Sequence, residues 1–169
     1  SIRGDLDGAE TMYHKALEID EKLGHIEGMA IGYGNLGILL QNRGDLDGAE
    51  AMHRKALQID EKLGRLEGKA SRYGNLGLIL DMRGDLDGAE AMHRKALEIY
   101  AKLGRLENMA KCYGNLGIVL KTRGDLVGAE AMYRKALEIN TKLGHLDGMA
   151  SDYGNLGNIL YFRNNLDGA

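Results

Sequence analysis

The chain has 169 residues, of which 44% are hydrophobic and 28% are charged, with one cysteine, no proline and no tryptophan. A single cysteine excludes a disulfide-stapled secreted domain, and 22 Lys and Arg against 25 Asp and Glu leave no basic excess to bind nucleic acid or an anionic membrane. No apolar run approaches the roughly 20 residues that span a bilayer, and residues 1–30 lack the pattern of a signal peptide. We therefore expect a soluble, cytoplasmic protein without nucleic-acid or membrane partners.

An internal repeat with a period of forty positions organises the whole chain. Each unit opens with Gly-Asp-Leu, and the units 44–83 and 84–123 are identical at 29 of 40 positions. A period between 20 and 50 residues is typical of a solenoid, in which each unit buries its apolar face against its neighbours. We predict a single array over 1–169, made of units 4–43, 44–83, 84–123 and 124–163 and a truncated unit, 164–169.

Two helical patterns follow each other within every unit. The first predicted helix of the chain covers 5–23, and its counterpart in the second unit follows Asp45, a candidate N-cap, and ends at Lys62-Leu63-Gly64. The next helix runs from about Leu66 to Arg83, with apolar residues at spacings of three and four. In the same frame the last predicted helix covers 146–163. We call the helix that starts after Gly-Asp-Leu helix B and the other helix A.

These patterns predict an all-α fold, because no stretch of the chain shows the period-two alternation of a strand. Short connections between the helices favour antiparallel neighbours. The chain should therefore contain eight helices in antiparallel pairs, beginning with a helix B and ending with a helix A.

The repeat resembles the tetratricopeptide repeat, whose signature is W-x2-L-G-x2-Y, then A-x3-F, then P. Tyr33, Leu36, Gly37 and Leu40, followed by Ala49-x3-His53, occupy the signature positions. Tyr replaces Trp, Leu40 replaces the second aromatic residue, His or Tyr replaces Phe, and the proline is missing. The length of the unit is similar to that of the repeats in Pins-like scaffolds and kinesin light chains. This resemblance implies a right-handed superhelical solenoid that binds proteins, but it specifies fold far better than function.

One asparagine of helix A is identical in all four units, although asparagine is a poor helix former. In tetratricopeptide arrays this position lines the concave surface. An amide can bond both the N–H and the C=O of one residue of an extended peptide, and the preceding glycine, Gly34 in the first unit, would leave room for it. The alternative is a hydrogen bond to the neighbouring repeat. The predicted ladder comprises Asn35, Asn75, Asn115 and Asn155.

Selectivity for a peptide would come from positions on the same face that vary between units. Random variation is the alternative. The first column reads Ile31, Ser71, Lys111 and Ser151. The second reads Ile38, Leu78, Ile118 and Asn158. The third reads Gln41, Asp81, Lys121 and Tyr161. The fourth reads Asn42, Met82, Thr122 and Phe162.

The glycine that follows each ladder asparagine by two positions has a different predicted role. Gly37 shares the face of Leu36 and Leu40, so we expect it to allow close approach of helix A to helix B near Ala49.

Nothing in the sequence predicts an enzyme, a cofactor or a metal site. His53 and His93 share their repeat position with Tyr13 and Tyr133, and a position that accepts Tyr is not a metal-ligand position. Cys112 stands alone, so we expect a surface or interface thiol rather than a nucleophile. Asp45 and Glu50 are interpreted as a helix cap and as a partner of Arg54 one helical turn later.

Two other functions remain open. Apolar residues at the two ends of the array would be exposed and could dock head to tail, which would grow filaments. The array could also be a passive spacer or sensor module of a larger signalling protein. The residues predicted to self-associate are Leu6, Met12, Tyr13 and Leu17 at one end and Tyr153, Leu156 and Leu160 at the other.

Overall fold

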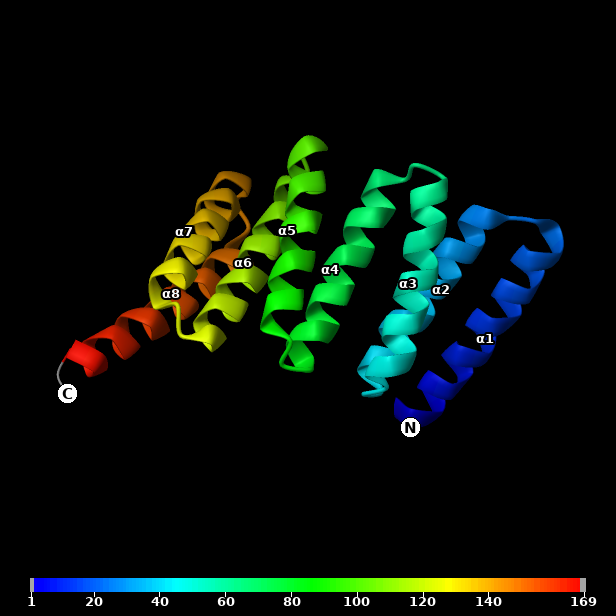
Figure 1. Ribbon diagram of the computed structural model, residues 1–169, viewed down its shortest axis with the longest axis horizontal. Coiled ribbons are helices and arrows are strands. Elements are labelled where there is room, and N and C mark those ends of the chain that lie inside the picture. Colours follow the sequence, from blue (N-terminus) through cyan, green and yellow to red (C-terminus); the bar gives the residue numbers. More distant parts are fainter. Residues whose placement is uncertain (1, 168–169) are drawn as a thin grey trace. The chain divides into compact units, whose positions relative to one another are not determined.

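A computed structural model describes the backbone of residues 2–167 and the side chains of residues 5–164. Over this range the chain forms eight α-helices, as the sequence predicts (Figure 1). It divides into two compact units, residues 1–79 and 80–169, which are described separately below. The helices are α1 (Ile2–Leu23), α2 (Ile26–Asn42), α3 (Leu46–Lys62), α4 (Leu66–Met82), α5 (Leu86–Lys102), α6 (Leu106–Arg123), α7 (Leu126–Leu143) and α8 (Leu146–Asp167).

The helix boundaries follow from local chemistry that recurs in each repeat. The Asp45 side chain accepts a hydrogen bond from Gly48 N at 2.9 Å and so caps α3, and Asp85 and Asp125 cap α5 and α7 in the same way. Glycine ends the preceding helix, since Gly44 and its counterparts adopt φ values between 65° and 92°. Only glycine adopts this left-handed conformation at little cost. The predicted caps and stop signals are thus confirmed.

Both terminal helices are longer than predicted. Helix α1 begins at Ile2 rather than Asp5, and α8 continues to Asp167 rather than ending at Arg163. In the earlier repeats a left-handed glycine ends the corresponding helix, whereas residue 164 is asparagine and the helix runs through it. The truncated unit 164–169 therefore does not restart the repeat within the described backbone.

In the first unit, α2 packs between α1 and α3 (Figure 1). Leu36, Ala49 and Ala56 are buried, as predicted. A Cβ atom on Gly37 would lie 2.7 Å from the imidazole of His53, so α2 and α3 approach closely because Gly37 lacks a side chain. The close approach predicted for Gly37 is confirmed, with His53 rather than Ala49 as the group that occupies the space.

In the second unit, the cluster of buried residues lies where α6, α7 and α8 meet. Tyr133 of α7 is fully buried, and a Cβ atom on Gly117 of α6 would lie 2.5 Å from its ring. Tyr133 thus takes the role that His53 has in the first unit. Leu120, Ala129, Leu156 and Ile159 complete the cluster.

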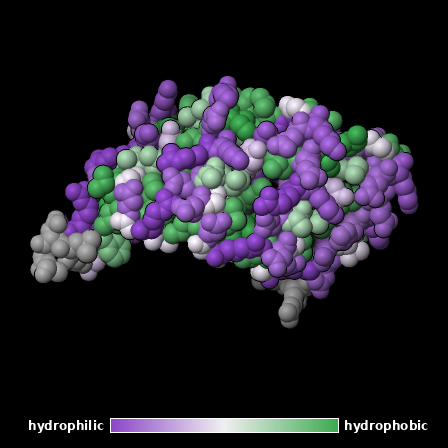
Figure 2. Space-filling view, in the orientation of Figure 1, coloured by the Kyte–Doolittle hydropathy of each residue, from purple (hydrophilic) through white to green (hydrophobic). Residues whose placement is uncertain are grey.

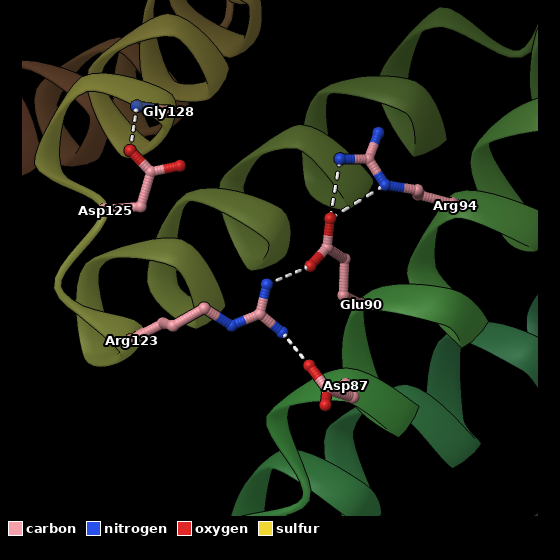
Figure 3. A network of polar contacts seen from close by, with 6 residues as sticks. All are labelled: Asp87, Glu90, Arg94, Arg123, Asp125 and Gly128. Carbon is pink, nitrogen blue, oxygen red and sulfur yellow. Dashed lines mark hydrogen bonds and ion pairs between the residues drawn. The ribbon is translucent and has the colours of Figure 1, made fainter.

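An ion-pair network joins α5 to α6 on the surface of the second unit (Figure 3). Arg123, the last residue of α6, reaches back to Glu90 and Asp87 of α5 at 2.5 Å each. Glu90 also pairs with Arg94 at 2.6 Å, one turn along α5. The first unit repeats the arrangement, where Arg43 contacts Asp7 and Glu10. The ion pair within a helix is predicted by the spacing of Glu50 and Arg54, whereas the ion pairs between helices are not.

Charged and polar residues occupy most of the face seen in Figure 2, and apolar residues show between them. None of the described helices is both long and apolar enough to cross a membrane.

Candidate functional site

A pocket of about 780 Å³ lies between α6 and α8 in the second unit, and we call it the α6–α8 pocket. The turn at residues 144–146 and the C-terminal end of α7, where Asn140 lies, also line it. Helix α6 contributes Glu107, Lys111, Gly114, Asn115 and Ile118. Helix α8 contributes Asp147, Ser151, Asp152 and Asn155. Both are A helices, so this is the surface on which the sequence analysis placed a peptide.

Two of the four ladder asparagines come together in this pocket. Asn115 and Asn155 are half-buried and line it from opposite helices. Neither amide makes a hydrogen bond or another polar interaction with any described residue, although an amide offers two donors and one acceptor. The alternative of a hydrogen bond to the neighbouring repeat therefore finds no partner among the residues that the structure describes.

The other two ladder asparagines, Asn35 and Asn75, are also half-buried, on α2 and α4 of the first unit. The second column is mostly open, with Ile38 and Ile118 exposed by 45% and 39%, Leu78 half-buried and Asn158 exposed. In the third column Tyr161 is exposed, whereas Gln41, Asp81 and Lys121 are half-buried. Ile118 lines the α6–α8 pocket, and Asn158, Lys121 and Tyr161 do not.

The space beside the glycine that precedes each asparagine is open at Gly74, Gly114 and Gly154 and filled at Gly34. A Cβ atom on Gly114 or Gly154 would meet nothing within 4 Å, which leaves the space that a peptide backbone needs. A Cβ atom on Gly34 would instead overlap the guanidinium of Arg72. The prediction that Gly34 keeps the groove clear is therefore wrong, because the long side chain of Arg72 already occupies that space.

Each repeat also places a pair of variable side chains at the junction of helices B and A. In the first unit Asp60 is 1% exposed, and its carboxylate lies 3.3 Å from Arg72 Nε and 3.7 Å from Arg65 Nη1. In the second unit Asn140 Nδ2 donates to Asp152 Oδ2 at 2.7 Å, and both side chains are buried. Burial raises the pKa of Asp152, and the hydrogen bond from Asn140 offsets this in part.

Sequence reasoning missed Asn140, His145, Asp147 and Asp152 as pocket residues, because it considered only one face of helix A. One signal was available. The two residues at the positions of Asp60 and Arg72 differ from one 40-residue repeat to the next, whereas most residues around them are constant. In chain order the pairs are Asp20 and Gly32, Asp60 and Arg72, Tyr100 and Cys112, and Asn140 and Asp152.

The residues predicted to self-associate divide into two groups. Met12, Tyr153 and Leu160 are exposed by 59%, 60% and 52%, whereas Leu6 and Tyr13 are half-buried. Leu17 and Leu156 are buried within their own units, Leu17 beside Gly32 and Leu156 in the cluster around Tyr133. The prediction that these two leucines expose apolar surface is wrong, because Leu17 of α1 packs against α2 and Leu156 of α8 packs in the cluster with α6 and α7.

No group of three or more His, Cys, Asp or Glu residues in the described part of the chain could hold a metal ion. His53 and His93 are buried core residues, and burial lowers the pKa of each to about 4, with Arg72 also acting on His53. Cys112 is 4% exposed, so it is an interface thiol rather than a surface one, and burial raises its pKa to about 11. A thiol with so high a pKa is protonated near neutral pH and is a poor nucleophile.

Comparison with known proteins agrees with this architecture. Sequence profiles described as tetratricopeptide repeat match residues 28–102 and 109–143, which together make up most of the chain. The chain belongs to the tetratricopeptide repeat family. Solenoids of this kind present extended surfaces that bind other proteins, and this tetratricopeptide repeat chain is a protein-interaction scaffold.

Two solved structures illustrate the likeness of this tetratricopeptide repeat chain to known folds. BtubC (BKLC) from P. vanneervenii is 27% identical with a TM-score of 0.78, and the match covers 96% of this chain and 68% of that one. The apo form of RapI is 17% identical with a TM-score of 0.88, and the match covers 96% of this chain and 60% of that one. No curated protein gives a significant sequence match. The second likeness supports the fold alone.

Proposed function

We propose that the chain binds an extended peptide segment of a partner protein, and that the amides of the ladder asparagines hold the peptide backbone. The observation that carries this proposal is the pair Asn115 and Asn155, which line one pocket with unpaired amides. Asparagine is a poor helix former, and yet it occupies this position in all four 40-residue repeats. Hydrogen bonding to a peptide would compensate for the cost to helix stability.

The variable positions would then select the sequence of the peptide. Ile118 offers an apolar contact beside Asn115, and Lys111 and Ser151 offer polar ones in the same pocket. The backbone contacts supply affinity for any extended segment, and these side chains discriminate between segments.

The test uses a degenerate library of short peptides and measures the fraction that the immobilised chain retains. We expect the Asn115→Ala and Asn155→Ala double variant to bind peptide about thirtyfold more weakly than the wild type, since each substitution removes hydrogen bonds worth about 1 kcal/mol. The matched control is Gln58→Ala, which removes an exposed amide from α3, a B helix. Helical circular dichroism confirms that the variants fold.

A second library, N-methylated at alternate residues, isolates the backbone contacts. N-methylation removes backbone donors and leaves side chains unchanged, so the wild type should retain this library poorly. Equal retention of the two libraries, or equal retention by wild type and double variant, would show that the asparagines do not bind a peptide backbone.

Self-association is the second candidate function, and one observation favours it. Tyr133 packs over Gly117, whereas a Cβ atom on Gly157, the same repeat position of α8, would meet nothing within 4 Å. Exposed Tyr153 and Leu160 lie on the same helix, so α8 offers an apolar face on which α1 of a second copy, with exposed Met12, could dock. A monomer in sedimentation at the highest soluble concentration would exclude this function for the chain, and would leave the spacer or sensor role as the alternative to peptide binding.

A further inference from the structure

The α6–α8 pocket contains a buried carboxylate that has no cationic partner among the residues that the structure describes. Asp152 is 5% exposed, and Asn140 Nδ2 is its one hydrogen-bond donor among the described residues. That bond uses Oδ2, whereas Oδ1 has no donor among the described residues and keeps some contact with solvent. A carboxylate that is withdrawn from water and not neutralised is costly, and a cation placed beside it recovers part of that cost.

The first unit shows how the same place in the fold is neutralised when the cation belongs to the chain. There the buried carboxylate is Asp60, and Arg72 and Arg65 lie within 4 Å of it. At the α7–α8 junction of the second unit, the positions equivalent to these two arginines hold Asp152 and His145. The α7–α8 junction thus has an amide, Asn140, where the first unit has Asp60, and a carboxylate, Asp152, where it has Arg72, so it holds a buried carboxylate but no guanidinium.

The other charged groups of the α6–α8 pocket strengthen the negative field. Glu107 and Lys111 lie 2.7 Å apart and neutralise each other, and the ion pair lowers the pKa of Glu107. Asp147 forms no ion pair with any described residue. The C-terminal end of α7 brings the negative end of its helix dipole to the pocket, and Asp147, in the first turn of α8, offsets the positive end of that helix.

We propose that the α6–α8 pocket selects peptides that carry a lysine or arginine side chain, which enters the pocket and pairs with Asp152 while Asn115 and Asn155 hold the adjacent backbone. The inference rests on the peptide-binding function proposed above. The volume of about 780 Å³ accommodates a long basic side chain together with the neighbouring peptide backbone. Lys111 forms its ion pair with Glu107 rather than with Asp152, so the Asp152 carboxylate is available to pair with the ligand.

The experiment measures how strongly the full chain retains four pools of short peptides of equal length. The pools are degenerate except at one central position, which is fixed as arginine, lysine, glutamate or norleucine. Norleucine matches the aliphatic stem of lysine without its charge. We expect the wild type to retain the arginine and lysine pools about tenfold more than the norleucine pool at low salt, because charge-assisted hydrogen bonds in a partly buried site are strong. Glutamate peptides should be retained least.

Two single variants test the role of Asp152. Asp152→Asn keeps the shape of the side chain and an oxygen for the bond from Asn140, and it should bring the ratio of lysine to norleucine retention close to one. Glu138→Gln is the matched control, since it removes one exposed carboxylate of α7 that lies outside the pocket, and it should leave the tenfold ratio unchanged.

The possible results separate this inference from the function on which it rests. If the wild type retains every pool equally, peptide binding stands and selection of a basic side chain is wrong. The same conclusion follows if Asp152→Asn keeps the preference. If no pool is retained, both proposals fail. Should Asp152→Asn not fold, the carbon-13 signal of the Asp152 carboxyl in the wild type replaces it, and its pKa should fall when the arginine pool is added; an equal change with the norleucine pool would overturn the inference.

Discussion

At the scale of single residues, the absence of one side chain decides how closely two helices approach. Gly37 and Gly117 stand at the same repeat position, and in each case an aromatic ring from the next helix occupies the space that a Cβ atom would need. His53 fills it in the first unit and Tyr133 in the second. Gly157 is the same position on α8, and nothing lies within 4 Å of its missing Cβ. Chemically identical substitutions should therefore have opposite effects.

We expect Gly37→Ala to destabilise the chain by about 1–3 kcal/mol, because the added methyl group forces the ring of His53 or the α2 backbone to move. Gly157→Ala should stabilise α8 by about 0.5–1 kcal/mol, since alanine is the better helix former and meets no obstacle. Urea denaturation of the two variants and the wild type measures both effects. A destabilising Gly157→Ala would show that the free face of α8 is occupied in solution.

At the scale of helices, an arginine near the end of α2, α6 and α8 connects each of these A helices to the helix B before it. Arg43 and Arg123 each contact one aspartate and one glutamate of that earlier helix. Figure 3 shows the contacts of Arg123. In the last repeat Val127 stands where the aspartate would be, so Arg163 contacts Glu130 alone, at 2.8 Å. The α7–α8 pair therefore has one ion pair fewer than the α5–α6 pair.

Val127→Asp should restore the second ion pair with Arg163 and raise the thermal midpoint at low salt. Val127 is 70% exposed, so the substitution removes little buried apolar surface. Exposed ion pairs are screened by salt, and the gain should shrink in concentrated sodium chloride. Val127→Asn, which has a similar shape without the charge, is the control. A gain that is equal for the two variants, or insensitive to salt, would contradict the ion-pair explanation.

The helices and their turns could be predicted from the sequence because their determinants are local. Asp45 and Gly64 act within one turn of a helix, and the internal repeat presents them again in each later unit. The end of α8 was mispredicted because the repeat frame was extended to Asn164, where the residue that stops the helix has changed.

The candidate site was only partly predictable. The period places Asn115 and Asn155 on one face of helix A, but the depth of the pocket depends on α7 and on the turn after it. Leu17 and Leu156 were assigned to exposed ends because repeat position alone does not distinguish a residue that faces a present neighbour from one that faces an absent one. A sequence pattern also does not show how far a long side chain extends. The guanidinium of Arg72, for example, occupies the space beside Gly34 on another helix.

At the scale of the whole molecule, each unit contains a histidine that is buried without a hydrogen bond. Both ring nitrogens of His53 and of His93 lack partners among the described residues. Burial lowers the pKa of each to about 4, from an ordinary value near 6.5, so both are neutral in the folded chain at neutral pH. In the unfolded chain the same rings take up protons as the pH falls below 6.5.

Stability should therefore fall between about pH 6.5 and pH 4, because the unfolded state binds protons there that the folded state does not. A pKa difference of this size corresponds to roughly 3 kcal/mol for each histidine, and Asp152, whose pKa is raised, opposes the loss slightly. The double variant His53→Tyr and His93→Tyr should flatten the profile, since Tyr133 already fits this repeat position. Urea midpoints across this range measure the effect, and a profile that is as steep in the variant as in the wild type would refute it.

The variable pairs at the junctions of helices B and A have a consequence for how the gene can change length. The two partners of each pair lie between stretches that are nearly identical from repeat to repeat, such as 44–57 and 84–97, which match at every position. Unequal recombination proceeds between such stretches, and a crossover there deletes or duplicates Asp60 together with Arg72, or Tyr100 together with Cys112. A crossover within 62–67 and 102–107, which are also identical and lie between the partners, would instead separate Asp60 from Arg72. Whole repeats can therefore be deleted or added with each pair intact when the crossover falls within 44–57 and 84–97, but not when it falls between the two partners.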